Sequence, residues 1–169
     1  MDATWPIPDP ASIIDSLHGR TCFSSLDLKA GYHNCKVREE DIPHTTFITH
    51  DGAWHWLRMP FGLKNVPAFF EHLVWKVVHV DASECWVVVY LDDITVSGAT
   101  LAEVWEHMLA VIAAGLHAAG FMINLNKCSF LVPSVEMVGH ILERDGYMVG
   151  DKALQRLMRA SLLSMYKEV

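Results

Sequence analysis

The hydrophobic and polar positions of the chain divide it into short strands and two longer helices. Apolar residues alternate around Phe23 and Leu26, which predicts a strand that ends near Asp27. Before this strand, residues 9–19 have the pattern of a short helix that stops at a glycine. Residues 5–10 are rich in proline and predict an extended N-terminal strap.

A hairpin and a helix are predicted in the middle of the chain. β-branched and aromatic residues lie on both sides of Asp51-Gly52, a dipeptide that favours tight turns, so we expect a hairpin over 45–59. Pro67 suits the first turn of a helix, and the run 68–80 contains no helix breaker. The β-branched valines in this run weaken the helix that we expect there.

A second helix is predicted with clearer ends. Thr100 and Glu103 form a capping-box pattern at its start, and Gly120 suits its end. The residues between them place an apolar stripe on one face. The stripe consists of Leu101, Val104, Met108, Val111, Ile112 and Leu116.

The order of the predicted elements indicates an α+β fold. Strand-like segments follow the second helix at 121–125, 128–132 and 136–142. Strand, hairpin, helix, hairpin, helix and strands in this order fit an antiparallel sheet with two helices packed on one face. The run Trp86–Tyr90 is apolar at every position, so we place it in the middle of the sheet, covered on both faces.

The composition fits a single globular domain over 1–169. Hydrophobic residues make up 51% of the chain, and no linker, repeat or low-complexity segment divides it. The apolar run Trp86–Tyr90 is far shorter than the roughly 20 residues of a membrane-spanning helix. The N-terminus lacks the pattern of a secretion signal, so we expect an intracellular protein.

Charge and metal-binding residues narrow the chemistry. The 4 cysteines and 10 histidines show no spacing typical of zinc or redox motifs. The net charge of −7 is unfavourable for binding nucleic acid, because such binding depends on lysine and arginine. A nucleic-acid-binding function therefore requires that basic residues line one groove or that a longer protein supplies the positive charge.

Two adjacent carboxylates are the first candidate functional residues. Asp92 and Asp93 lie between two apolar runs, at the tip of a predicted hairpin. Aspartate favours turns, so a solvated turn is the simplest interpretation. If the strand that ends at Asp27 is a neighbour of this hairpin, three carboxylates gather at one edge of the sheet and need cations to offset their repulsion. Two divalent ions so placed carry out nucleotidyl transfer in polymerases.

Five segments together resemble the motifs of a known family. They are FSSLDLKAGYHNCKV, MPFGLKNVPAFFEHL, VVVYLDDITV, AAGFMINLNKCSF and MVGHIL, in this order. The chain from about residue 5 to 146 resembles the reverse transcriptase domain of long-terminal-repeat retrotransposons and retroviruses, closest to the Ty3/gypsy-like group. The resemblance implies a polymerase palm with part of the fingers, formed by a hairpin over 45–65. Residues 1–20 would form the strap and a short helix, and 147–169 diverge from the family pattern.

The resemblance also implies a catalytic centre. It assigns two Mg²⁺ or Mn²⁺ ions to Asp27, Asp92 and Asp93, and the departing pyrophosphate to Lys127, which is otherwise an ordinary solvated lysine. The assigned nucleotide-binding residues are Leu28, Gly31, Tyr32, Phe61 and Gly62, and the assigned primer or template residues are Glu71, Tyr90, Leu91, Val138, Gly139 and His140.

Plain structural alternatives exist for several of these assignments. Tyr32 falls where the family places an aromatic gate against the ribose 2′-hydroxyl, and Phe61 falls where the family lines the nucleotide pocket. Both are equally typical of aromatic residues that pack in a core. Val138-Gly139-His140 resembles the primer grip, and it also fits an ordinary hairpin turn.

Departures from the family pattern bear on activity. Glu71 stands where the family usually has glutamine, and Asn34 stands where glutamine is common. A negative charge at position 71 would repel a template phosphate. The chain begins at the strap WPIP, so we expect the upstream fingers strands and their triphosphate-binding basic residues to be missing.

More than one function remains open. The first is an RNA-directed DNA polymerase that uses an RNA or DNA template, a DNA primer and dNTPs. The second is a retroelement-derived palm without catalytic activity that acts as a structural or interaction subunit, with tryptophans on a partner surface. Those tryptophans are Trp54, Trp56, Trp75 and Trp86. A third is an unrelated metal-dependent phosphohydrolase that uses the same carboxylates.

Overall fold

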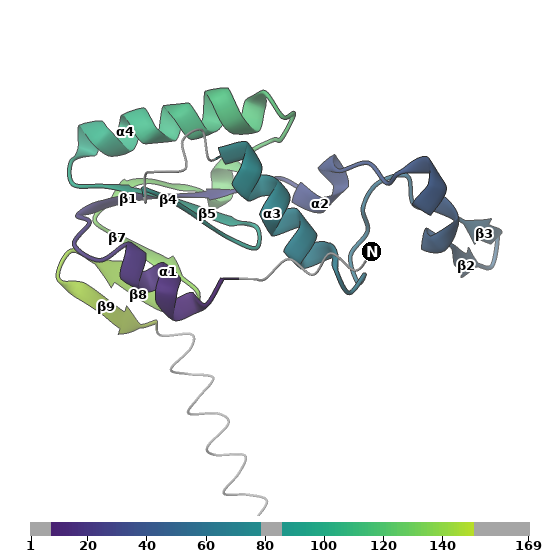
Figure 1. The fold of residues 1–169 in the computed structure, drawn as a ribbon, viewed down its shortest axis with the longest axis horizontal. Helices are drawn as coiled ribbons and strands as arrows, with labels where there is room; N and C mark the ends of the chain where they lie inside the picture. Colours follow the sequence, from purple (N-terminus) through teal and green to yellow (C-terminus); the bar gives the residue numbers. More distant parts are fainter. Residues whose placement is uncertain (1–7, 79–85, 151–169) are drawn as a thin grey trace, which may run out of the picture.

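The structure is a computed structural model of the chain and describes residues 8–78 and 86–150 (Figure 1). Part of the predicted N-terminal strap, the end of the helix expected over 68–80 and the segment 151–169 lie outside the described residues. The described ranges contain a four-stranded sheet, a three-stranded sheet, a two-stranded hairpin and the helices around them.

A four-stranded antiparallel sheet forms the centre of the fold. Its strands are β1 (Cys22–Asp27), β4 (Val87–Tyr90), β5 (Asp93–Gly98) and β6 (Ser129–Val132), in the order β4-β5-β1-β6. β1 pairs with β5 along its whole length and with β6 on its other edge, in both cases antiparallel. The first predicted strand and its end at an aspartate are therefore confirmed.

The strand Val87–Tyr90 lies at the edge of this sheet, so its predicted place in the middle is wrong. Val87 and Val89 are buried in one core, whereas Val88 and Tyr90 pack against a second core on the opposite face. An apolar sequence indicates that both faces of a strand are covered. It does not indicate the position of the strand in the order of the sheet.

Two helices cover one face of the sheet. They are α3 (Val66–Val78) and α4 (Leu101–Leu109), which continues as the π-helical segment Ala110–His117. Figure 1 shows α4 lying across the face of β1, β4 and β5. Both helices were predicted. The first core between the helices and the sheet includes Leu26, Phe70, Val74, Ile94, Val96, Val104, Val111 and Leu116, each fully buried.

The start of α4 is capped by the predicted pair of residues, with one of the two hydrogen bonds displaced by one residue from a standard capping box. Thr100 Oγ1 accepts a hydrogen bond from the backbone amide of Glu103 at 3.2 Å. Glu103 Oε2 in turn accepts from the backbone amide of Ala99 at 2.9 Å. Such a cap typically stabilises a helix by about 1 kcal/mol, because it satisfies amides that have no partner inside the helix.

The opposite face of the central sheet is covered by a helix and a second sheet. These are α1 (Pro10–Ser16) and the antiparallel strands β7 (Ser134–Met137), β8 (His140–Glu143) and β9 (Gly146–Val149). Figure 1 shows them on the side away from α4. Only α3 and α4 therefore share the face on which two helices were expected. The second core consists of Ile13, Ile14, Leu17, Phe23, Val135, Met137 and Leu142.

The segment after α4 differs from the strand predicted over 121–125. Only Ile123 forms a β-bridge, to Leu28, and the chain then turns through the 3-10 helix η3 (Leu125–Lys127). The backbone amide of Asn124 donates to the carbonyl of Asp27 at 2.9 Å. The segment therefore pairs antiparallel with the residues at the end of β1 over a single bridge, which is too short to be a strand.

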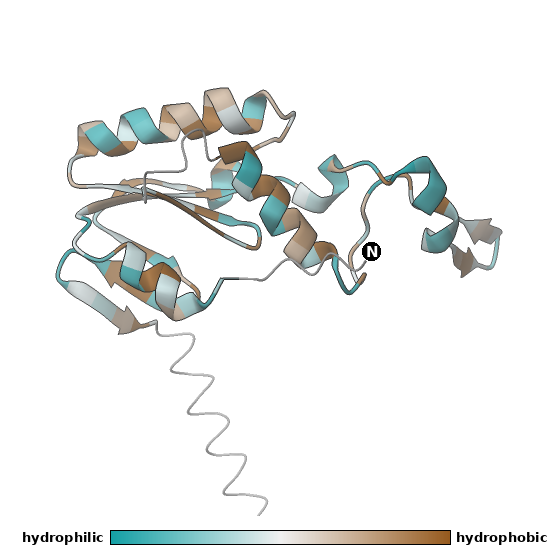
Figure 2. Cartoon of the chain, viewed as in Figure 1, coloured by the Kyte–Doolittle hydropathy of each residue, from teal (hydrophilic) through white to brown (hydrophobic). Residues whose placement is uncertain are grey.

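The residues between β1 and α3 extend to one end of the molecule (Figure 1). They form the short helix α2 (Gly31–Asn34), the 3-10 helix η1 (Glu39–Thr45) and the hairpin of β2 (Phe47–Thr49) and β3 (Gly52–Trp54). The hairpin predicted over 45–59 is confirmed. Figure 2 shows hydrophobic residues on its strands, and all six strand residues are exposed.

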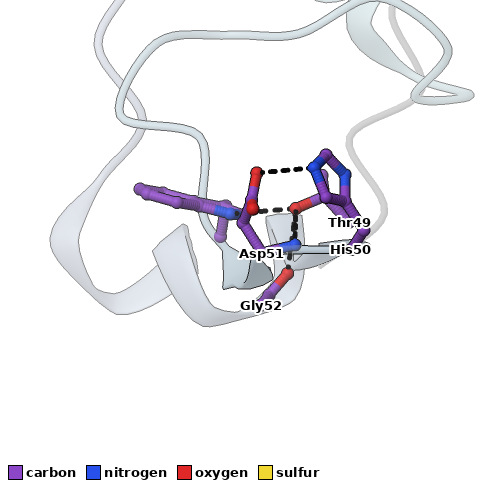
Figure 3. Close-up of polar contacts among 5 residues, drawn as sticks. Thr49, His50, Asp51 and Gly52 are labelled. Atoms are coloured by element: carbon purple, nitrogen blue, oxygen red, sulfur yellow. Dashed lines mark hydrogen bonds and ion pairs between the residues drawn. The ribbon is translucent and has the colours of Figure 1, made fainter.

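The turn of this hairpin lies one residue earlier than predicted. Thr49 pairs with Gly52, so His50 and Asp51 form the turn. Thr49 Oγ1 accepts from the backbone amide of Asp51 at 3.3 Å and from Trp54 Nε1 at 3.2 Å (Figure 3). His50 Nε2 lies 3.2 Å from Asp51 Oδ2 at the surface, where such a pair contributes little stability. These polar groups satisfy one another within the turn.

None of the helices in the described ranges combines the length and the apolar character that a bilayer-spanning segment needs.

Candidate active site

The three candidate carboxylates meet at one end of the central sheet. In the antiparallel register of β1 and β5, Asp27 stands directly opposite Asp93. Asp92 lies in the two-residue turn between β4 and β5, immediately before Asp93. The strand that ends at Asp27 is therefore a neighbour of the aspartate hairpin, as the predicted site requires.

The pKa of Asp93 reflects both its burial and the negative charges of the other two carboxylates. Partial burial of its carboxylate raises the pKa of Asp93, the charges of Asp92 and Asp27 raise it further, and Lys127 lowers it. Asp93 also keeps exposed surface, so solvent screens each of these interactions. Lys127 offsets the negative charge only in part, and the site electrostatically favours a cation.

The turn that presents Asp92 is conformationally strained. Leu91, its first residue, has a φ of 56°, in the left-handed region. This region costs a residue with a side chain roughly 1–2 kcal/mol. The pairing of Tyr90 with Asp93 closes the turn and holds the strained residue in place.

A cavity of about 190 Å³ opens beside Asp27 and Asp92. Seven of its lining residues were predicted as site residues, and four were not. The predicted ones are Asp27, Leu28, Gly31, Tyr32, Phe61, Asp92 and Lys127, and the others are Lys29, Ala30, Phe70 and Asn124.

The four residues that were not predicted lack a clear local signal. Phe70 belongs to the apolar pattern of α3, which is typical of any core helix. Asn124 lies in the segment that was expected to be a strand. Ala30 adopts a left-handed conformation with φ of 50°, unusual for alanine, just before α2. Lys29 follows the strand-end aspartate by two residues, which is the only signal that marks it.

An aromatic wall borders the cavity. The ring centroid of Tyr32 lies 5.1 Å from that of Phe61 and 4.7 Å from that of Phe70, with Phe70 edge-on. A Cβ atom on Gly31 would lie 2.6 Å from Phe70 Cζ, so only glycine fits there without moving the ring. Phe61 is 68% exposed, so it is not the core aromatic of the alternative interpretation. Gly62 follows it with a φ of 90° and does not line the cavity.

Lys127 lines the same cavity, beside Asp27. Its Nζ is 3.5 Å from Asp27 Oδ2, and the lysine side chain is 67% exposed. The Cys128 side chain reaches the backbone of Asp27, and burial raises the pKa of this thiol. The loop after α4 therefore places a cation beside the first carboxylate, at the cavity where a charged ligand would bind.

The structure places Glu71 inside the core and not on a surface open to a template. Its side chain is 4% exposed, and neither carboxylate oxygen has a hydrogen-bond partner. Burial raises the pKa of Glu71, and the nearby backbone amide of Leu91 lowers it but lies outside hydrogen-bond geometry.

The predicted primer residues lie on the side of the second core. Val138 and Gly139 form the turn between β7 and β8, with φ values of 51° and 77°. His140 Nδ1 lies 3.2 Å from the carbonyl oxygen of Val138. Tyr90 and Val138 both pack against the second core, and none of these residues lines the cavity. The hairpin geometry is present, and contact with a primer stays a prediction.

The carboxylates fit a divalent metal ion of the oxygen-binding class. Within the described ranges, no group of three or more His, Cys, Asp or Glu side chains is placed to hold a metal ion by itself. Mg²⁺ is usually held by one or two carboxylates together with substrate phosphates and water, so it does not need such a group. Asp27 and Asp92 share one cavity, and the pKa of Asp93 is raised first by burial and then by the charges of these two carboxylates.

Comparison with known proteins identifies relatives along almost the whole chain. The family model described as "Reverse transcriptase (RNA-dependent DNA polymerase)" matches residues 2–142. The Retrovirus-related Pol polyprotein from transposon opus of Drosophila melanogaster is 35% identical over 167 residues, which cover 98% of this chain and 16% of the polyprotein. The Transposon Tf2-3 polyprotein of Schizosaccharomyces pombe is 28% identical over 155 residues, which cover 92% of this chain and 12% of the polyprotein.

Solved structures show the same fold. A foamy viral protease-reverse transcriptase in complex with an RNA/DNA hybrid aligns with a TM-score of 0.77 and 24% identity, covering 88% of this chain and 20% of that one. A second foamy viral structure, in complex with double-stranded DNA, gives a TM-score of 0.78 at 24% identity and covers 90% of this chain and 26% of that one. The chain thus spans only a small part of each relative.

Proposed function

Because this chain belongs to the reverse transcriptase (RNA-dependent DNA polymerase) family, we propose that it forms the palm of an RNA-directed DNA polymerase. Its reaction would extend the 3′-hydroxyl of a DNA primer on an RNA or DNA template with dNTPs. The observation that carries the proposal is the register of β1 and β5, which sets Asp27 opposite Asp93, next to the turn from which Asp92 lines the same cavity as Asp27.

Asp27, Asp92 and Asp93 would hold two Mg²⁺ or Mn²⁺ ions. Such ions, when bound, activate the attacking hydroxyl and stabilise the departing pyrophosphate. The protein contributes by presenting carboxylates from two hydrogen-bonded strands, whose spacing is set by the sheet. The strained turn at Leu91 aims Asp92 into the cavity, at a site that needs little reorganisation during the reaction.

The aromatic wall would select the nucleotide. Tyr32 is held between Phe61 and Phe70, and the close approach of Gly31 to Phe70 leaves the tyrosine little freedom to move aside. A fixed ring at the sugar would exclude a 2′-hydroxyl group by its volume. Lys127, beside Asp27, would neutralise charge or donate a proton as pyrophosphate leaves.

The nucleic-acid partners follow from the relatives. The foamy viral enzymes were solved with an RNA/DNA hybrid and with double-stranded DNA. We infer the same duplex partners for this chain. Its net charge of −7 opposes binding of a polyanion, so binding should be weak and strongly dependent on salt concentration.

Primer extension tests this proposal directly. The chain is incubated with Mg²⁺ or Mn²⁺, dNTPs and a DNA primer on an RNA template, beside Asp92→Asn and the control Asp145→Asn. Asp145 is an exposed aspartate outside the site. We expect weak extension that Asp92→Asn abolishes and Asp145→Asn preserves. Extension that survives Asp92→Asn would show that these carboxylates are not the site.

A second candidate function is a palm without catalytic activity that binds another protein. Large apolar side chains exposed around the β2–β3 hairpin favour it, with Ile48 at 83%, Leu57 at 66% and Trp54 at 53% exposure. Trp86, which was expected on the same kind of surface, is 8% exposed and therefore belongs to the core. Absence of extension under all conditions, with the fold intact, would support this second function.

A further inference from the structure

The side chain of Cys128 completes the β1–β6 ladder at Asp27. The last regular pair between these strands is Ser25 with Ser129. In an antiparallel strand, every second backbone amide points to the same neighbouring strand. After Ser25, the next amide of β1 that points to β6 is therefore that of Asp27. This amide donates to Cys128 Sγ at 3.4 Å. The thiol thus supplies the acceptor that the backbone of β6 no longer offers.

The same sulfur also makes a hydrogen bond within the Asn124–Cys128 loop, which lies against the end of β1. The thiol of Cys128 donates to the carbonyl of Asn124 at 3.3 Å, and the amide of Asn124 donates to the carbonyl of Asp27 at 2.9 Å. The amide of Lys127 also donates to the carbonyl of Asn124, at 2.9 Å. Both backbone groups of Asp27 are therefore bonded to one short segment.

The arrangement links the carboxylate to its cation. Lys127 Nζ lies 3.5 Å from Asp27 Oδ2, and the lysine is the sequence neighbour of Cys128. The thiol of Cys128 contacts the backbone amide of Asp27, and Lys127 contacts the carboxylate of the same residue. A change at the sulfur therefore alters the backbone from which the carboxylate is presented, without touching the carboxylate itself.

We propose that Cys128 is a positioning residue of the active site, whose thiol holds the backbone of Asp27 against the Asn124–Cys128 loop and so fixes the direction of the Asp27 carboxylate. The proposal rests on the proposed function only for the catalytic role of Asp27. Serine can still accept and donate a hydrogen bond at this place, whereas alanine can do neither.

Amide hydrogen exchange in the full chain tests the contact itself. In Cys128→Ala we expect the Asp27 amide to exchange roughly 2- to 10-fold faster, the factor that corresponds to one modest hydrogen bond. Cys128→Ser should restore most of the protection. Cys22→Ala is the matched control, because Cys22 is a buried thiol at the other end of the same strand. It should leave the Asp27 amide unchanged.

The ¹³Cγ resonance of Asp27 tests the consequence for the carboxylate. It should shift in Cys128→Ala and return toward its original position in Cys128→Ser. Three results would each overturn the proposal: wild-type exchange at Asp27 in the alanine variant, acceleration spread evenly along β1, or an unmoved resonance. If serine fails to restore the contact, the sulfur acts by packing and the proposal is likewise wrong.

Polymerase kinetics then separate this proposal from the proposed function. Where the chain is active, Cys128→Ala should lower kcat several-fold with little change in KM for dNTP, since the residue touches no substrate. A wild-type chain without activity would count against the proposed function alone, and the exchange and resonance measurements would still decide the role of Cys128.

Discussion

Replacing Glu71 by glutamine should stabilise the protein, and the gain should grow as the pH rises. The Glu71 side chain is 4% exposed, and neither of its oxygens has a hydrogen-bond partner. Glutamine has nearly the same shape and stays neutral at every pH. The substitution therefore removes a buried ionisable group and creates no cavity.

The sign follows from the direction of the pKa shift. Burial raises the pKa of Glu71 in the folded chain above its ordinary value of 4.5. Its contribution to stability is fully present below the ordinary value and is lost as the pH rises through the raised one. Between the two, the folded chain holds a proton that the unfolded chain has released, so the free energy of unfolding falls by at most about 1.4 kcal/mol per pH unit. Above the raised pKa the loss levels off.

The expected magnitude can be bounded. Glutamine leaves its amide as unpaired as the protonated carboxyl group, so the gain comes from the charge alone and is at most about 1.4 kcal/mol for each pH unit between the ordinary and the raised pKa. For a chain of this size, 1 kcal/mol shifts Tm by roughly 2–4 °C. The Tm difference between Glu71→Gln and the wild type should therefore grow by at most roughly 3–6 °C for each pH unit of this interval.

Thermal and urea denaturation of both forms from acidic to alkaline pH measures this gain. Asp93 also has a raised pKa, but it is present in both proteins and cancels in the difference. Glu106→Gln, at an exposed site on α4, is the matched control and should change little at any pH. A difference that stays constant with pH, or that favours the wild type as pH rises, would refute the reasoning.

Two further predictions concern the cavity and its charge. Gly31→Ala should destabilise the chain by about 1–3 kcal/mol, because the new methyl group would displace the fully buried ring of Phe70; an unchanged urea midpoint would contradict this. Binding of Mg²⁺ should release protons from the protein, since a cation lowers the raised pKa of Asp93. The number of protons released should grow toward acidic pH. Calorimetry in buffers of different ionisation enthalpy measures it, and equal release from Asp27→Asn would place the ion elsewhere.

Patterns of short range predicted most of the elements. The alternation around Phe23 located β1, and the capping pair at Thr100 located the start of α4, because each depends on residues adjacent in the chain. The hairpin turn was displaced by one residue, since the side chain of Thr49 organises it in a way that the dipeptide alone does not show. The strand expected over 121–125 is absent, because this segment forms only a short antiparallel pairing with the residues at the end of β1.

Sequence reasoning reached the cavity residues whose chemistry is carried by their own side chains. Asp27, Asp92 and Lys127 line the cavity, and their catalytic roles stay predictions. Phe70 and Asn124 were missed. Phe70 lies on a buried helix face and Asn124 in a loop, and each lines the cavity only because of the segments that pack beside it. The burial of Glu71 was also hidden, because its sequence neighbours suit an exposed or a buried position equally well.

By itself, the amino-acid sequence determined the types of element, the two-sided apolar character of β4 and the identity of the acidic residues, because these depend on local periodicity and side-chain chemistry. Tertiary structure alone decided that β4 lies at the edge, that Asp27 faces Asp93 and that a thiol reaches the backbone of the first aspartate. Strand order and side-chain contact arise from pairing between segments far apart in the chain, and no local pattern encodes that pairing.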